Sequence, residues 1–134
     1  MPTRTFHKER DVKAEIKKIL DRHGWTFRWM PAANGYGKAG VSDFCVLKDG
    51  TFMAIEAKYA GRKPTPLQIQ FLNNVFLNDG FGFVVDETRL EALDTFLRCF
   101  ATSAARKATG SDVSPDDGAA MLDAIQAMTV ELTG

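Results

Sequence analysis

Cysteine is scarce in this chain of 134 residues, which has two thiols, Cys45 and Cys99. Two cysteines are too few for the disulfide framework of a small secreted domain, and their spacing is not that of metal ligands. Each lies inside an apolar segment, so we expect both to be core thiols in a reducing cytoplasm. Long apolar runs and an apolar signal core are also missing, and we therefore expect no membrane span and no secretory leader.

The chain also lacks a net charge, because 17 Lys and Arg balance 17 Asp and Glu. This balance alone argues against a nucleic-acid-binding protein, but the distribution of the charges argues for one. Residues 1–63 hold 13 basic and 7 acidic residues, whereas residues 64–134 hold 4 and 10. The sequence therefore predicts a basic face built from the first half and a separate acidic region.

The apolar pattern predicts an α/β fold, with a mixed sheet flanked by helices in the order α-β-β-β-α-β-α. Strands 41–47 and 51–58 are apolar on both faces, which is typical of strands covered by helices on both sides. The small, polar residues 101–114 predict a linker after a domain at 1–100. An extra helix is expected within 115–134, either packed on the core or serving a partner subunit. The other expected elements are helices at 8–23, 66–78 and 86–100 and strands at 25–30 and 81–85.

Asp49 and Gly50 lie midway between Asp43 and Glu56, and an Asp-Gly pair favours a two-residue β-hairpin turn. With this turn, Asp43 lies directly opposite Glu56. Because side chains alternate between the faces of a strand, Lys58 shares a face with both carboxylates. Like charges that face each other destabilise a hairpin, and a bound divalent cation would remove that penalty. The alternative is an ordinary surface hairpin with scattered charges.

Two carboxylates and an ammonium group at one end of a hairpin are suited to phosphodiester hydrolysis. Mg²⁺ prefers oxygen ligands and keeps several waters, so Asp43, Glu56 and the backbone carbonyl of Ala57 could bind it. The cation would polarise the phosphate and activate a water molecule, while Lys58 orients the water or neutralises developing charge. A carboxylate from the first helix could complete the site.

Three short motifs carry a resemblance to a known family: GVSD at residues 40–43, EAK at 56–58 and TPLQ at 65–68. Together they resemble the PD-(D/E)XK nuclease superfamily, and most of all the small stand-alone VRR-NUC domains of phages and bacteria. The resemblance spans about residues 8–95 and implies a restriction-endonuclease-like core. Ser42 stands where the superfamily motif has proline; this removes a rigid residue and not a ligand.

The resemblance implies a role for each matching residue. Asp43 and Glu56 match the metal-binding acids and Lys58 the catalytic lysine. Gln68 matches a glutamine near the active site, although a capping box with the preceding threonine also explains it. Family members also carry a glutamate on the first helix. Glu9 matches that position best, and Glu15 is its rival.

Two loops supply candidate DNA-binding residues outside the motifs. Tyr36 and Lys38 lie in a glycine-rich loop and could contact a base and the DNA backbone. Arg62 and Lys63 follow the predicted active strand and could bind phosphates, and the alternative for both loops is a solvated connection. Trp25 and Trp29 alternate along one predicted strand and are expected in the core, with a base-stacking platform as the alternative.

The resemblance thus implies a Mg²⁺- or Mn²⁺-dependent DNA endonuclease in the cytoplasm of a bacterium or a phage-infected host. It also implies a homodimer that cleaves branched DNA such as Holliday junctions. Two alternatives stay open. One is a catalytically silent nuclease-like module that only binds nucleic acid or a partner, and the other is a flap or single-strand nuclease of the same fold.

Overall fold

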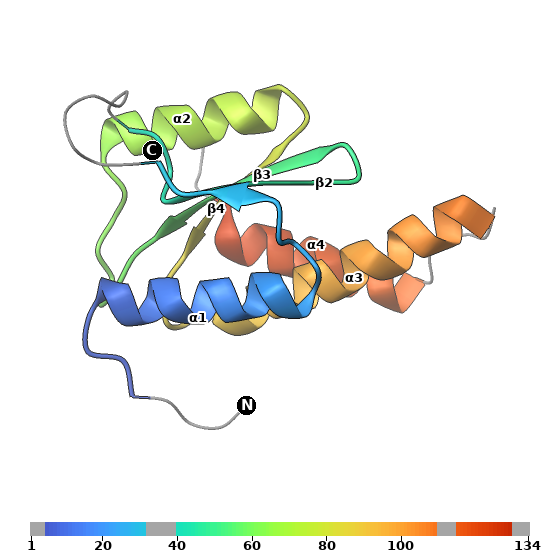
Figure 1. Cartoon of the computed structure of the whole chain (residues 1–134), viewed down its shortest axis with the longest axis horizontal. Helices are drawn as coiled ribbons and strands as arrows, with labels where there is room; N and C mark the ends of the chain where they lie inside the picture. The colour runs from blue at the N-terminus through green and yellow to red at the C-terminus, as the bar shows by residue number, and fades with distance from the viewer. Residues whose placement is uncertain (1–4, 32–39, 110–114, 130–134) are drawn as a thin grey trace.

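The chain forms a four-stranded sheet between layers of helices, as the computed structural model shows (Figure 1). The structure describes residues 5–31, 40–109 and 115–129, and the following statements concern these residues. The elements in chain order are α1 (Glu9–Arg22), β1 (Arg28–Trp29), β2 (Phe44–Lys48), β3 (Thr51–Ala57), α2 (Pro66–Leu77), β4 (Phe81–Val85), α3 (Leu90–Thr109) and α4 (Pro115–Met128). A mixed α/β fold with a flanked sheet is therefore confirmed.

The sheet has the strand order β1-β2-β3-β4. Strands β1, β2 and β3 pair antiparallel, and β4 runs parallel to β3 across the α2 connection. Asp49 and Gly50 form the hairpin turn, with φ angles of 50° and 79°. Both positive angles are those of a type I′ turn, whose twist matches that of the flanking strands. The register, from Lys48 opposite Thr51 to Phe44 opposite Ile55, confirms the predicted hairpin.

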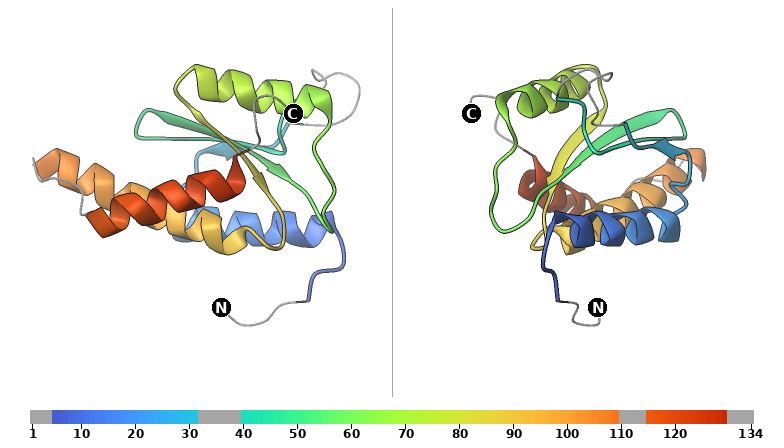
Figure 2. Two further views of the ribbon diagram at one scale, coloured as in Figure 1. Left: turned by 180° about the vertical axis from the view of Figure 1, so that it is seen from behind. Right: turned by 60° about the vertical axis from the view of Figure 1, so that its left-hand side comes forward.

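Helix α2 covers one face of the sheet, and α1, α3 and α4 lie on the other (Figure 1). Figure 2 shows the same layers from two further sides. The larger core lies between the sheet and α1, α3 and α4, and includes Val12, Ile16, Phe44, Met53, Phe83, Leu93, Phe96 and Leu97. A smaller cluster of Ala54, Leu72 and Val84 lies beneath α2. The hairpin strands are thus covered on both faces along part of their length.

Helix α3 differs from its expected bounds at both ends. It begins at Leu90 because Asp86 forms a turn in which its carboxylate accepts hydrogen bonds from the backbone and hydroxyl of Thr88. It continues to Thr109, so a linker over 101–109 is wrong. The segment holds four alanines and neither Gly nor Pro, and alanine is the strongest helix former. Residues 110–114, the rest of that expected linker, lie outside the described part of the chain.

Helix α4 packs back on the core, one of the two arrangements expected for residues 115–134. Ala124 and Met128 are buried in the larger core, and Arg89 Nε donates to the carbonyl of Ala127 at 2.7 Å. Residues 130–134 lie outside the described residues. No helix in the described part of the chain is long and apolar enough to cross a membrane.

Candidate active site

Asp43 and Glu56 meet at the open end of the β2–β3 hairpin, as the predicted register required. The last strand pair joins Phe44 to Ile55, which leaves Asp43 just before β2 and Glu56 as the second-last residue of β3. Asp43 Oδ2 accepts a hydrogen bond from the backbone amide of Ala57 at 2.9 Å. This bond joins the two strands beyond their regular pairing and fixes one carboxylate beside the other.

Lys58 follows β3 and shares the face of Glu56. Its Nζ lies 3.4 Å from Glu56 Oε1, and 12% of its side chain is exposed. The backbone amide of Lys58 donates to the carbonyl of Val85, which holds the end of β3 against β4. The ammonium group is therefore positioned by the sheet itself, next to a carboxylate and within reach of solvent.

Glu56 is a buried carboxylate with unmet bonding capacity, since 3% of its side chain is exposed. Its Oε2 atom is buried and has no hydrogen-bond partner among the described residues. Burial, and after it the charge of Asp43, raise the pKa of Glu56 to about 7, although Lys58 partly opposes both effects. A buried carboxylate oxygen without a donor is costly unless a cation or proton compensates it.

Lys13 of α1 is a further residue at the site, and the sequence interpretation missed it. Its Nζ lies 3.1 Å from Asp43 Oδ1 and 3.6 Å from Glu9 Oε2. Burial lowers the pKa of Lys13, but Asp43 and Glu9 outweigh burial and raise it above its ordinary value. The only signal in the sequence is that Lys13 lies one helical turn after Glu9. Lys13 neutralises Asp43 from the neighbouring element.

The two candidate helix glutamates lie in different surroundings. Glu9 reaches the site through Lys13, which it shares with Asp43. Glu15 Oε2 lies 3.9 Å from Lys18 Nζ, both on α1. The described contacts thus connect Glu9 with the hairpin carboxylates through Lys13. A direct role for Glu9 as a metal ligand stays a prediction.

Gln68 has the local role that the capping-box alternative gave it. Thr65 Oγ1 accepts from the Gln68 amide at 3.2 Å, and Gln68 Oε1 accepts from the Thr65 amide at 2.8 Å. Pro66 occupies the first turn of α2. This reciprocal pair fixes the start of α2, as the TPLQ motif predicted. A catalytic role for Gln68 stays a prediction.

The GVSD motif brings the start of β2 against α2. Gly40 has a φ of +89°, and a Cβ there would lie 2.6 Å from the carbonyl oxygen of Leu67. Ser42 is buried and its hydroxyl donates to the carbonyl of Phe44 at 3.0 Å. Ser42 therefore stabilises the backbone on either side of Asp43, in place of the rigidity that proline would supply.

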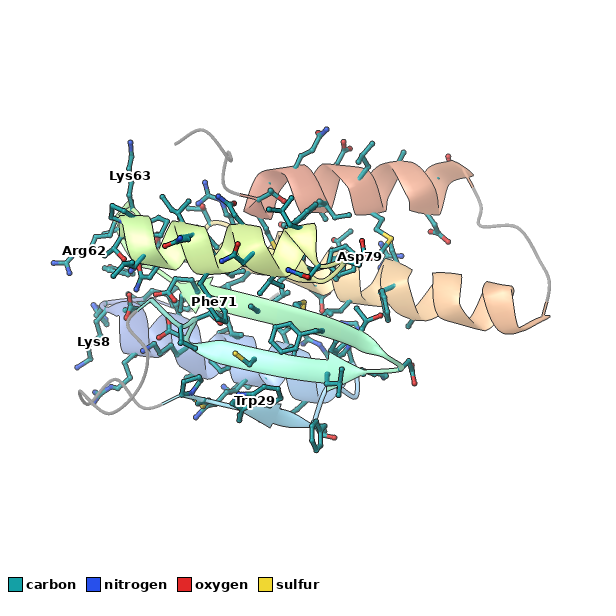
Figure 3. All side chains as sticks on the ribbon, turned by 90° about the horizontal axis from the view of Figure 1, so that it is seen from above. Lys8, Trp29, Arg62, Lys63, Phe71 and Asp79 are labelled. Atoms are coloured by element: carbon teal, nitrogen blue, oxygen red, sulfur yellow. The ribbon has the colours of Figure 1, made fainter. Side chains whose placement is uncertain are left out.

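Basic side chains lie at the same end of the molecule as the hairpin carboxylates. Arg62 and Lys63 are exposed in the loop that follows β3, and Figure 3 shows them at one end together with Lys8. The other candidates for DNA binding, Tyr36 and Lys38, lie outside the described residues. Arg62 and Lys63 therefore follow the strand that carries Glu56, whereas Lys48 lies beside the hairpin turn, so a single basic face stays a prediction.

The site has the donor set of a hard, oxygen-preferring cation. Within the described residues, no group of three or more His, Cys, Asp and Glu side chains is arranged to hold a metal. Asp43 and Glu56 supply two carboxylates, and one of them has a buried oxygen to which none of the described residues donates a hydrogen bond. Mg²⁺ commonly binds through one or two carboxylates and keeps several waters, so the residues present fit it. The carbonyl of Ala57 as a third ligand stays a prediction.

No protein-family model matches this chain, and no curated protein matches it.

Proposed function

We propose that this protein is a Mg²⁺- or Mn²⁺-dependent DNA endonuclease. The observation that carries the proposal is the hairpin end, where Asp43 and Glu56 converge beside the Lys58 ammonium and one buried Glu56 oxygen has no hydrogen-bond partner within the described part of the chain. Such a cluster is unfavourable as a structural device, because it buries a carboxylate beside a second one. Carboxylates whose pKa is strongly shifted and that lie beside a specific charged partner are typical of functional sites.

Each residue has a separate role in the proposed reaction. Asp43 and Glu56 would hold the cation, and the cation would supply Lewis acidity and a water of lowered pKa. Lys58 Nζ would orient the attacking water and neutralise charge on the phosphate. Lys13 would hold Asp43 in position before the cation binds, since it contacts Oδ1 while the Ala57 amide contacts Oδ2.

The sheet supports a restriction-endonuclease-like core as part of this proposal. Three antiparallel strands followed by a parallel fourth, with one carboxylate just before the second strand and the other on the third, agree with the resemblance to VRR-NUC domains. Arg62 and Lys63, next to the end of β3, would bind the phosphate backbone. Branched DNA as substrate and a homodimer as the active form belong to the same proposal.

A panel of DNA substrates tests the proposal. Linear duplex, flap and four-way-junction DNA are incubated with the protein in Mg²⁺, Mn²⁺ or EDTA. We expect cleavage with either metal and none in EDTA. Failure to cleave every substrate with both metals would leave the silent binding module as the better account. Cleavage of flaps without junctions would instead favour the flap nuclease.

A further inference from the structure

Three aromatic residues lie on the same sheet face as the two carboxylates. Trp29 pairs with Cys45, the next residue after Asp43 on that face of β2. The amide of Leu47 donates to the carbonyl of Phe27, and Leu47 pairs with Phe52 in the following row. Same-face positions along a strand are about 6.8 Å apart and neighbouring strands about 4.8 Å. By these spacings the Cα atoms of Trp29 and Asp43 are about 8 Å apart. Phe27 and Phe52 lie one same-face position further from Asp43 along the strands.

The aromatic residues form a connected and open surface, which we call the aromatic platform (Phe27, Trp29 and Phe52). The Phe27 and Trp29 rings lie 6.3 Å apart, and the Trp29 and Phe52 rings 5.9 Å. Phe27 is 67% exposed and Trp29 46%, so the expectation that Trp29 is a core residue is wrong. Figure 3 shows why: β1 and β2 lie beside α2 and not beneath it.

A groove continues the aromatic platform between the hairpin and α2. It has a volume of about 440 Å³, within the range of ligand pockets. Its lining combines flat apolar surface with two amide side chains, which can hydrogen-bond the edges of a base. The lining residues are Phe52, Phe71, Asn74, Val75, Asn78 and Gly80. The groove thus offers both stacking and polar contacts on the same face as the carboxylates.

A nucleobase fits this surface better than a protein partner does. Stacking on aromatic side chains is how proteins bind bases whose faces are free, and it tolerates any sequence. In a duplex the base faces are already stacked, so the surface favours unpaired nucleotides. The platform is also continuous with the site proposed to bind a phosphate, and the first half of the chain carries most of its basic residues.

We propose that the aromatic platform stacks unpaired bases of the DNA strand whose backbone reaches the two carboxylates, an inference that rests on the proposed nuclease function. The preferred DNA then carries single-stranded nucleotides within one or two positions of the scissile phosphate. The platform acts in binding and positioning, so its effect is measurable without cleavage.

Binding of short DNA in EDTA tests this proposal. A labelled oligo(dT) of about 12 nucleotides, which suits the length of known single-strand sites, is compared with a duplex of equal length by fluorescence anisotropy. We expect the oligo(dT) to bind about tenfold more tightly and to quench tryptophan emission, because Trp29 is accessible while Trp25 is 1% exposed. Equal affinity for both DNAs, or emission that does not change on binding, would overturn the proposal.

Substitutions of Trp29 separate stacking from simple burial of apolar surface. Trp29→Leu should weaken oligo(dT) binding about tenfold and leave duplex binding unchanged, whereas Trp29→Phe should stay within about threefold. Leu77→Ala is the matched control, since Leu77 is 72% exposed at the far end of α2. Retained oligo(dT) affinity in Trp29→Leu would overturn the proposal. So would sedimentation showing that this variant loses self-association instead, because a second copy would then cover the surface.

The outcomes for stacking and for nuclease activity are distinguishable. If the wild type cleaves DNA and Trp29→Leu binds and cleaves normally, the nuclease stands and the stacking site falls. If oligo(dT) binding depends on Trp29 but no metal supports cleavage, the stacking site stands and the nuclease falls.

Discussion

Glu56 is buried beside a second carboxylate. Because this burial shifts its pKa, the free energy of unfolding depends on pH. Its pKa is raised from 4.5 to about 7. Between these values the folded state keeps a proton that the unfolded chain has lost, so the free energy of unfolding falls as pH rises. Glu56→Gln removes this loss and should stabilise the metal-free protein by about 1–3 kcal/mol near pH 8.

Urea unfolding in EDTA at about pH 5 and about pH 8 measures this effect. The advantage of Glu56→Gln over the wild type should be larger at the higher pH. Glu91→Gln, at an exposed position on α3, serves as the control and should differ little from the wild type at both. A difference between Glu56→Gln and the wild type that does not change with pH would contradict the assignment of the raised pKa to Glu56.

Lys13 forms an ion pair with the Asp43 carboxylate, which a metal ion would also need. Because its ammonium lies 3.1 Å from Asp43 Oδ1, a divalent cation there meets a neighbouring positive charge. Lys13→Met should therefore tighten Mn²⁺ binding by about three- to tenfold, a modest electrostatic effect at a partly solvated site. Calorimetric titration with Mn²⁺ measures it, with Lys17→Met, exposed on the same helix, as control. Unchanged or weaker Mn²⁺ binding by Lys13→Met would show that Lys13 does not compete for Asp43.

The GVSD segment packs against helix α2 at Gly40. Gly40→Ala would bring a Cβ within 2.6 Å of the Leu67 carbonyl at a positive φ, so we expect a loss of about 2 kcal/mol or more. Gly118→Ala, where no atom of the described residues lies within 4 Å of an added Cβ, should stabilise α4 by about 0.5–1 kcal/mol. Chemical denaturation compares the two. Equal effects would mean that Gly40 is not needed for this approach.

Local sequence signals predicted the elements around the site. The Asp49-Gly50 turn set the hairpin register, and the TPLQ capping box set the start of α2, since both depend on residues close in the chain. Contacts between distant elements escaped prediction. The approach of Lys13 to Asp43 and the exposure of Trp29 depend on how helices lie across the sheet. The small, polar residues at 101–109 are typical of a linker by composition. Four of them are alanine, which also favours helices, so composition alone could not decide between the two.

The burial of α2 shows the same limit at the level of a helix face. The apolar pattern predicts an inward face of Leu67, Phe71, Val75 and Phe76. Phe71 and Val75 do pack against the smaller cluster, but Leu72 is more buried than either and Leu67 is 52% exposed. Among the described strands this helix mainly contacts β3 and β4, so part of its apolar surface extends past the sheet. Apolar pattern alone cannot say how much sheet lies beneath a helix.

At the scale of the whole molecule, the basic residues near the hairpin end should govern DNA affinity. Arg62→Ala should weaken binding to all DNA sequences and lower the slope of log affinity against log salt by about 1. Arg98→Ala, on α3 away from the carboxylates, should leave the slope unchanged. Binding measured in EDTA across a salt series tests both. An unchanged slope in Arg62→Ala would remove this loop from the DNA interface.

We propose that the carboxylates and the lysine at the hairpin end hydrolyse DNA. The most direct test is single-turnover cleavage in Mn²⁺, on a substrate that the wild type cleaves, by Glu56→Gln and the wild type at equal DNA saturation. We expect the rate to fall by about a thousandfold or more, as is typical when a group at the reacting centre is removed, with DNA affinity within about threefold. Cleavage by Glu56→Gln at a near wild-type rate would contradict the account.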